Sequence, residues 1–361
     1  MNAKIGVGIL GFAHGHVYAY CDEWKNPELG IAVIAGWDHD PQRLEAACSQ
    51  FGLEGYADAD KLLERADIQA VVIASETSRH AELVELAAAS GKAIILQKPL
   101  ALTMAEADRI VEAIDKHQVP FTLAWQMRTD PQNIQMKHWI ESGELGQIFM
   151  VRRRHGLPVG LHADFANTWH VDPAANRDIW ADDSSHPIDF IHWLLGEPDS
   201  VTAEIGSLYS PRVPMDNGIA IYRYAGGGPI VEVSCSFTCN AAQNTTEIIG
   251  SKGTIVQNYG DATSCNVPRP DESEGAAAVA GLIKFTTETG KWTPSDIASP
   301  PNHGVRIRGL AKPLADFIQG ARGPLATAEE GRTSLRMVLA TYVSNEEGRR
   351  VRLGDPKIEQ V

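Results

Sequence analysis

The sequence predicts two domains: a doubly wound α/β domain with a parallel sheet, and an α+β domain with a large, mostly antiparallel open sheet. The chain has 361 residues, whereas one domain usually takes about 100–200. Over the first 125 residues, apolar runs of strand length alternate with helical segments, as in a parallel sheet covered by helices. After residue 125 the strand-like segments follow one another through glycine-rich turns, which favours antiparallel pairing.

The first domain is predicted to span residues 1–125. Its apolar strand segments lie at 4–10, 31–37, 69–75, 92–99 and 119–125. Its helical segments lie at 16–24, 41–51, 81–91 and 103–118. Pro41 suits the first turn of its helix, and Thr103 with Glu106 forms a capping-box sequence at the start of the last helix. We expect these helices to cover both faces of the sheet.

The second domain is predicted to span residues 126–361. A helix at 131–143 precedes the strand-like segments 147–155, 200–209, 218–226, 229–237 and 246–256. The segment 157–198 is rich in Trp, His and Asp, and residues 262–302 show no clear pattern. A terminal helical stretch, 305–347, could pack back on the first domain.

Composition argues against two classes of partner. The formal net charge is −14, and an acidic surface repels both the phosphates of nucleic acid and anionic lipid. No apolar stretch reaches the ~18 residues of a membrane helix, and the apolar N-terminus is predicted to be a strand.

The five cysteines form an odd, scattered set, which indicates reduced thiols and a cytoplasmic protein. Period 2 predicts Cys235 and Cys239 on one sheet face, as packed small residues.

A nucleotide-binding fingerprint lies near the N-terminus. The literal pattern G-x-G-x-x-G occurs at Gly6, Gly8 and Gly11, but its first two glycines fall inside the predicted strand. The register that puts a strand before and a helix after begins at Gly11, with Gly11 in the tight turn. Ala13 and His16 then take the positions of the other two glycines, while the helix N-terminus still offers an anion site.

An acidic residue is placed to select the cofactor. Asp38 ends the second strand, where a carboxylate can accept hydrogen bonds from the ribose hydroxyls of NAD and repel a 2′-phosphate. No Arg follows it immediately, so we expect NAD in preference to NADP. The alternative is a doubly wound domain without a nucleotide.

The chain resembles the glucose-fructose oxidoreductase / inositol dehydrogenase / rhizopine-catabolism family, Gfo/Idh/MocA. Five stretches carry the resemblance, in order along nearly the whole chain. They are GILGFAHGH with Asp38, VVIASETSRHAELVELAAASGKAIILQKP, DDSSHPIDFIHWLLG, EIIGSKGTI and the tail LADFIQG…EEGRTSLRMVLATYVSNEEGRRV. The second is similar to a family stretch that runs from a Thr-Pro-Asn-type loop through a His to Glu-Lys-Pro.

The resemblance implies a Rossmann domain, a second domain whose open sheet often forms an oligomer interface, and hence a homodimer or homotetramer. It implies an active site between the domains, with Lys98, Asp182 and His186 as catalytic groups. The cofactor-binding residues that it implies are Gly11, Phe12, Ala13, His14, His16, Asp38, Ser75, Glu76, Thr77, His80, Gln97 and Lys98. Two departures stand out: Gln97 replaces the family Glu before the Lys, and Asp183 adds a second carboxylate.

These residue types suit the oxidation of an alcohol. His186 is the natural base for the hydroxyl proton because its unperturbed pKa lies near neutrality. If the stretch is helical, Asp182 shares its face and can orient the imidazole or hold a substrate hydroxyl. Lys98 ends a strand at the carboxyl edge of the sheet, where its ammonium can stabilise a developing alkoxide. The bond to Pro99 is a candidate cis peptide.

Polar and aromatic residues outside this trio are candidate substrate contacts. Aromatic faces stack on sugar C–H surfaces, and His, Arg and Asp bond hydroxyls. Arg128 is either a structural or a substrate-facing residue. The set is Arg128, His155, Trp169, His170 and Asp183.

The predicted function is an NAD-dependent oxidoreductase acting on a hydroxyl carbon of a sugar, an inositol or a glycoside. One alternative uses NAD transiently to cleave a glycoside without net oxidation. A second is a metal enzyme built on His155, His170, Asp182, Asp183 and His186, although no short ligand motif is present and no metal is expected. A third is an NAD-responsive binding protein without catalysis.

Overall fold

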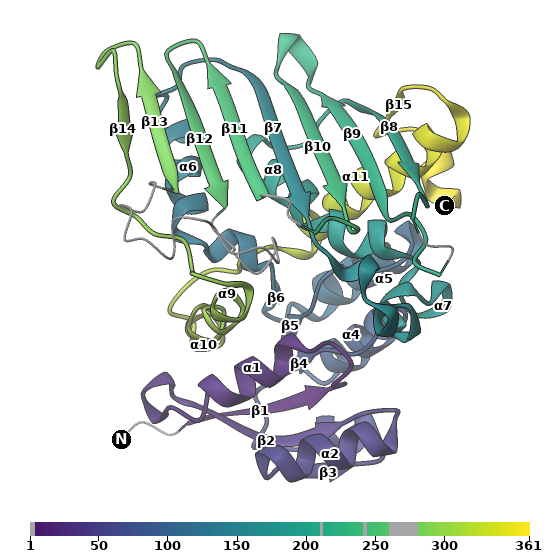
Figure 1. Ribbon diagram of the computed structural model, residues 1–361. Coiled ribbons are helices and arrows are strands. Elements are labelled where there is room, and N and C mark those ends of the chain that lie inside the picture. The colour runs from purple at the N-terminus through teal and green to yellow at the C-terminus, as the bar shows by residue number, and fades with distance from the viewer. Residues whose placement is uncertain (1–3, 210–211, 241–243, 260–280) are drawn as a thin grey trace. The chain divides into compact units, whose positions relative to one another are not determined.

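A computed structural model describes the chain except for residues 1–3, 210–211, 241–243 and 260–280 (Figure 1). It divides into two compact units. The first comprises residues 1–129, 174–176 and 304–335; the second comprises 130–173, 177–303 and 336–361. Within the described ranges, no helix is both long and apolar enough to cross a membrane.

The first unit is built on a six-stranded parallel sheet of order β3-β2-β1-β4-β5-β6. Its strands are β1 Ile5–Leu10, β2 Ile31–Trp37, β3 Glu54–Tyr56, β4 Ala70–Ile73, β5 Ala93–Leu96 and β6 Phe121–Leu123. Its longer helices are α1 His16–Glu23, α2 Pro41–Phe51, α4 His80–Ala89, α5 Met104–His117, α9 His303–Arg308 and α10 Ala311–Ile318. The order reverses between β1 and β4, so the doubly wound prediction is confirmed. The sequence analysis missed β3 and the short helix α3 Ala59–Leu63.

The literal pattern G-x-G-x-x-G places two glycines, Gly6 and Gly8, inside β1 and one, Gly11, after it. A Cβ on Gly6 would lie 1.9 Å from the Asp67 carbonyl oxygen, so Gly6 serves strand packing. Gly11 has φ of +91°, and a Cβ there would lie 2.6 Å from the Cα and N of Ser75. The tight turn predicted at Gly11 is therefore confirmed. Gly15 differs, because nothing lies within 4 Å of its virtual Cβ.

Helix starts follow their sequence signals. Pro41 takes the first turn of α2, and the N-cap Asp40 accepts hydrogen bonds from the backbone N–H groups of Gln42 and Arg43. The capping box of Thr103 and Glu106 is present at the start of α5. These caps fix where α2 and α5 leave the carboxyl edge of the sheet.

His80 ties two loops of this edge together. Its Nδ1 lies 2.9 Å from the Pro99 carbonyl oxygen and therefore carries the proton that it donates. The Lys98–Pro99 peptide is cis, as predicted. Complete burial lowers the pKa of His80 to about 4, against weaker opposing effects of the surrounding carbonyl groups. His80 is thus a neutral imidazole that anchors the segment carrying Lys98.

The second unit is built on a nine-stranded sheet of order β14-β13-β12-β11-β7-β10-β9-β8-β15. Its strands are β7 Ile148–Gly156, β8 Ser200–Gly206, β9 Asn217–Arg223, β10 Ile230–Ser236, β11 Asn244–Gly250, β12 Gly253–Tyr259, β13 Leu282–Thr286, β14 Trp292–Pro294 and β15 Val351–Arg352. All pairs are antiparallel except β7 with β10. The prediction of a mostly antiparallel sheet is confirmed.

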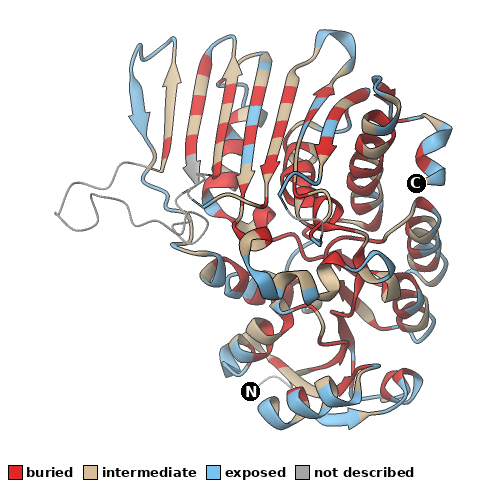
Figure 2. Ribbon diagram, turned by 45° about the vertical axis from the view of Figure 1, so that its right-hand side comes forward, coloured by how far each residue is buried: buried red, intermediate tan, exposed pale blue. Residues whose placement is uncertain are grey.

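One face of this sheet is covered and the other is open. Buried and partly exposed residues alternate along β10, and Figure 2 shows the alternation across the sheet. The covered face meets α8 Ser185–Leu195, which packs on β7 and β10, and the later part of α11 Ala328–Glu347. Tyr222 donates to the Met337 carbonyl oxygen of α11 at 3.1 Å. Helix α6 Pro131–Glu141 lies behind the sheet on the same side (Figure 1).

The same-face prediction for Cys235 and Cys239 is wrong. Cys235 is buried in β10, but β10 ends at Ser236, so the period-2 rule no longer applies at Cys239. The Cys239 thiol instead donates to the Leu157 carbonyl oxygen at 3.4 Å. Cys265 lies outside the described residues.

Gly11→Ala is expected to lower the free energy of unfolding by about 3 kcal/mol, because a left-handed backbone strains an L-residue and the added methyl overlaps Ser75. The matched control Gly15→Ala adds its methyl to open space and is expected to change stability by less than about 1 kcal/mol. Urea denaturation of both variants measures the difference. Equal losses would contradict the assignment of the tight turn to Gly11.

His80→Asn is expected to flatten the dependence of stability on pH. The unfolded chain protonates His80 near pH 6.5, whereas the folded chain resists protonation until about pH 4. The unfolded state therefore binds more protons in this window, and stability falls as pH drops through it, by up to about 3 kcal/mol. Denaturation curves between pH 7 and pH 4 measure the slope. A slope that is the same in His80→Asn and wild type would refute this reading.

Candidate active site

The residues expected to bind the cofactor gather at one edge of the parallel sheet. Strand pairing aligns Leu10 with Trp37 and with Ile73, and Ile73 with Leu96. The segments that follow these four positions therefore emerge side by side at the carboxyl edge. They hold the Gly11–His16 turn, Asp38, the Ser75–Thr77 loop and Gln97–Lys98. Such an edge, where the strand order reverses, is the usual ligand site of an open α/β sheet.

The Gly11–His16 turn joins β1 to the start of α1. The Gly11 N–H donates to the Trp37 carbonyl oxygen at 2.7 Å and the His14 N–H to that of Ala74 at 2.9 Å, so the turn is fixed to its neighbours. Phe12 and His14 are buried, and the rings of His14 and His16 lie 4.3 Å apart. The helix N-terminus at His16 is a favourable place for an anion.

Asp38 is buried and receives four hydrogen bonds. The backbone N–H groups of Phe12 and Asp40 donate to it at 2.7 and 2.8 Å. The guanidinium of Arg43 donates twice, from Nε and Nη2, each at 2.7 Å. Burial raises the pKa of Asp38, but the hydrogen bonds from Arg43, Asp40 and Phe12 outweigh it and hold that pKa below its ordinary value.

Arg43 is a partner of Asp38 that the sequence analysis missed. No Arg follows Asp38 immediately, but one lies five residues further on. Arg43 lies in the first turn of α2, and that turn brings its side chain back to the end of β2. Its Nη2 also donates to Glu76 Oε1 at 2.9 Å, linking the loops after β2 and β4. The spacing in sequence did not reveal this contact because it depends on the helix direction.

Lys98 and Gln97 end the β5 segment. Both side chains are buried, and the Gln97 amide donates to the Tyr20 hydroxyl of α1 at 2.9 Å. Burial raises the pKa of Tyr20 well above its ordinary value, so the phenol stays neutral. A neutral amide in this fully enclosed position costs less than a carboxylate would. The departure from the family Glu therefore fits its surroundings.

Asp182 and His186 lie in the second unit, where a π-helical turn, Trp180–Ser184, leads into α8. Asp182 Oδ2 is 2.8 Å from Nδ1 of His170. Asp183 Oδ1 is 3.6 Å from Nε2 of His186. Asp182 thus has a partner, His170, that the sequence did not predict, while its expected role, to orient the His186 imidazole or to hold a substrate hydroxyl, stays a prediction.

The remaining candidate substrate residues of this unit join the same cluster. The His155 ring centroid lies 6.2 Å from that of His186. Trp169 stacks on His170 with centroids 3.9 Å apart, and Phe165 lies on His170 at 5.8 Å. His155 thus contacts His186, which lies near Asp183. The preceding residue in the chain, Asp182, bonds His170, and His170 stacks on Trp169 and Phe165. The result is a polar and aromatic cluster of the kind that binds hydroxylated molecules.

The hydrogen bonds of Arg128 favour the structural alternative. Its side chain is buried, and Nη1 donates to the Leu325 carbonyl oxygen at 3.0 Å and to Glu330 at 2.8 Å. These bonds tie the turn after β6 to the start of α11. The sequence did not show this role because Glu330 lies 202 residues away.

Asp178 is a supporting residue that sequence reasoning missed. Its Oδ1 accepts hydrogen bonds from the Tyr342 hydroxyl at 2.6 Å and from the Ala181 N–H at 2.9 Å. Burial raises the pKa of Asp178 despite these bonds. Arg177, just before it, has φ of +68°. The π turn that carries Asp182 is therefore braced from α11, through a contact that no local pattern reveals.

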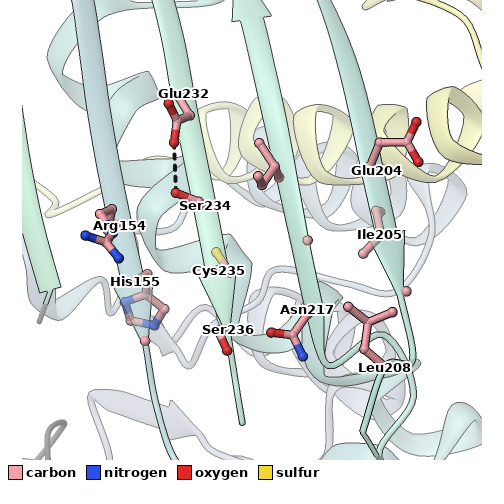
Figure 3. A pocket seen from close by; sticks show the side chains of 14 residues that line it. Arg154, His155, Glu204, Ile205, Leu208, Asn217, Glu232, Ser234, Cys235 and Ser236 are labelled. Atoms are coloured by element: carbon pink, nitrogen blue, oxygen red, sulfur yellow. Dashed lines mark hydrogen bonds between the residues drawn. The ribbon is translucent and has the colours of Figure 1, made fainter. Parts of the chain in front are cut away.

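A separate hollow of about 640 Å³ lies on the open face of the sheet in the second unit (Figure 3). Figure 3 shows Glu232, Ser234, Arg154 and Glu204 projecting into it from neighbouring strands. His155 is one of its lining residues, whereas Asp182 and His186 are not. The part of the chain that the structure describes contains no group of three or more His, Cys, Asp or Glu residues placed to hold a metal ion.

Comparison with known proteins identifies the two halves. Residues 3–124 match the oxidoreductase family with an NAD-binding Rossmann fold, and residues 133–256 match the GFO/IDH/MocA C-terminal domain. The chain is 26% identical to D-apiose dehydrogenase of Paraburkholderia graminis over 361 residues, 98% of this chain and 89% of that protein.

Solved structures share the fold. A putative NADPH-dependent oxidoreductase from Desulfitobacterium hafniense matches with a TM-score of 0.81 and 21% identity. The match covers 99% of this chain and 100% of that chain. Levoglucosan dehydrogenase in complex with NADH and levoglucosan matches with a TM-score of 0.77 and 21% identity. The match covers 98% of this chain and 100% of that chain. With two family models matched in order and the fold shared over its length, the chain belongs to the Gfo/Idh/MocA family of NAD-binding Rossmann-fold oxidoreductases.

Proposed function

We propose that the chain is an NAD-dependent dehydrogenase that moves a hydride between the nicotinamide and a hydroxyl carbon of a sugar, an inositol or a glycoside. The observation that carries the proposal is the gathering of the Gly11 turn, Asp38 and Lys98 at one edge of the parallel sheet. A dinucleotide site and a proton-handling ammonium group then lie on the same edge. Relatives named for apiose and levoglucosan support a sugar-like substrate.

The residues at this edge fit a dinucleotide. The turn that begins at Gly11 leads directly into α1, and the N–H groups at the start of that helix favour the pyrophosphate of a dinucleotide. The end of β2 and the loop after β4 carry two carboxylates, Asp38 and Glu76, against the one guanidinium of Arg43, and we expect the adenosine ribose at this end of β2. The excess of negative charge supports NAD over NADP. When bound, the cofactor supplies a hydride acceptor.

The protein residues handle the proton. His186 accepts the hydroxyl proton as the hydride leaves the carbon that bears this hydroxyl, and the carboxylate of Asp183 favours the imidazolium that results. Lys98 hydrogen-bonds the reacting oxygen and stabilises its negative charge. Asp182, paired with His170, holds a substrate hydroxyl or fixes the His170 ring beside Trp169. We assign catalysis to Lys98, Asp182 and His186 on this basis.

A second candidate keeps the same residues but returns the hydride. Oxidation of a sugar hydroxyl to a ketone acidifies the adjacent C–H, so a base can remove that proton and expel a glycosidic leaving group. Addition of water and return of the hydride then give net hydrolysis, with the cofactor regenerated. The observation that favours it is Asp183, a second carboxylate 3.6 Å from His186, which would serve a second proton transfer.

We further propose a cytoplasmic homodimer or homotetramer. Cys21, Cys48 and Cys235 are free thiols, which supports a reducing compartment. Large apolar side chains stand exposed on the open sheet, among them Ile219, Ile221 and Trp292, which supports a protein partner there.

The function is tested by following reduced-nicotinamide absorbance. Purified protein with NAD is mixed with inositols, free sugars, sugar acids and glycosides, and we expect steady NADH formation with at least one of them. Lys98→Ala and His186→Ala are expected to lower kcat at least about 100-fold, because each removes a group that moves or stabilises the proton.

A variant remote from the site controls for damage to the fold. Arg109→Ala breaks an exposed ion pair with Glu85 and is expected to keep wild-type activity. Glycoside consumption that requires NAD without net NADH would instead favour the transient-oxidation candidate. Wild-type rates in both Lys98→Ala and His186→Ala would contradict the catalytic assignment.

A further inference from the structure

Arg43 is held between two carboxylates at the end of β2. Its Nε and Nη2 donate to Asp38, and Nη2 also donates to Glu76 Oε1. The Asp38 side chain has no exposed surface, and that of Glu76 is 11% exposed. The guanidinium is thus paired on both sides by groups that have little contact with water, where ion pairs are screened least.

Glu76 joins this bridge from a different loop. It lies in the loop after β4, whereas Asp38 and Arg43 follow β2. Glu76 therefore adds to the first unit a negative charge that reaches Arg43 from the loop after β4.

Arginine is the side chain best suited to bind a phosphate. Its planar guanidinium donates two parallel hydrogen bonds to phosphate oxygens. An Arg near the end of the second strand is also the group that accommodates the 2′-phosphate of NADP in doubly wound domains. Arg43 stands in the right place for that task, but its Nε and Nη2 are already engaged.

We propose that Glu76 is a specificity-determining residue, which locks Arg43 onto Asp38 and so excludes cofactors with a phosphate on the adenosine ribose. The inference rests on the proposed function as a nicotinamide-dependent enzyme. Asp38, Arg43 and Glu76 together carry a net negative charge, which opposes a dianionic phosphate and not a ribose diol. Freed from Glu76, Arg43 can turn one edge of its guanidinium toward a 2′-phosphate.

The test is direct binding of NADH and of NADPH, measured by fluorescence titration of wild type and Glu76→Gln. Glutamine keeps the shape of the side chain and removes its charge. We expect wild type to prefer NADH, and Glu76→Gln to shift the ratio of the two Kd values toward NADPH by at least about tenfold. The thermal melting temperature of each variant verifies folding.

A double variant isolates the part played by Arg43. In Glu76→Gln combined with Arg43→Gln, the gain in NADPH binding is expected to disappear, because the guanidinium that would bind the phosphate is gone. The matched control Glu85→Gln breaks an exposed Arg pair in the same unit and is expected to leave the ratio unchanged.

Two results would overturn the inference while leaving the proposed function intact: an unchanged Kd ratio in Glu76→Gln, or a gain that persists in the double variant. A wild-type protein that binds NADPH more tightly than NADH would also overturn it. A wild-type protein that binds neither dinucleotide would contradict the proposed function itself, and the inference with it.

Discussion

The carboxylate of Asp38 is the polar link on which the cofactor edge of the first unit depends. Phe12, in the turn after β1, and Asp40, before α2, both donate backbone hydrogen bonds to it. Arg43 extends the link to Glu76, in the loop after β4. Three loops that strand pairing brings to one edge are thus held by a single buried, ionised group. A buried charge of this kind persists only because every donor is in place.

The proposed catalytic residues are braced in a similar way. Asp182 sits on a π turn that Asp178 and Tyr342 hold from α11. In the first unit, His80 holds the Pro99 carbonyl beside Lys98 in the same way. In each case a buried neighbour positions a proposed catalytic residue. Burial lowers the pKa of His80 to about 4, so its imidazole stays neutral near pH 7, whereas burial raises the pKa of Asp178.

Local signals in the sequence were sufficient for the fold. The strand 31–37, the capping box at Thr103 and the register of the Gly11 turn depend on a few adjacent residues, and each was found where it was predicted. The oxidoreductase family and its Rossmann domain followed from motifs of the same local kind. The three-residue strand β3 was missed because so short a strand has no readable period.

The side-chain partners could not be read in the same way. The pairing of Asp182 with His170 joins residues 12 positions apart, on two turns whose contact no local pattern predicts. The bonds of Arg128 to Glu330 and of Asp178 to Tyr342 join residues more than 160 positions apart. The bridge from Asp38 to Glu76 requires knowing that β2 and β4 flank β1. These contacts are products of the tertiary structure.

Transfer of a labelled hydride tests the central claim most directly. The protein is incubated with NAD and with polyols and sugars that carry deuterium on their hydroxyl-bearing carbons, and the reduced cofactor is analysed by mass spectrometry. The account predicts one deuterium in the nicotinamide ring of the reduced cofactor, and no label when only the hydroxyl protons are exchanged for deuterium. Reduced cofactor without deuterium, or oxidation of the sugar with no label passing through the nicotinamide, would contradict it.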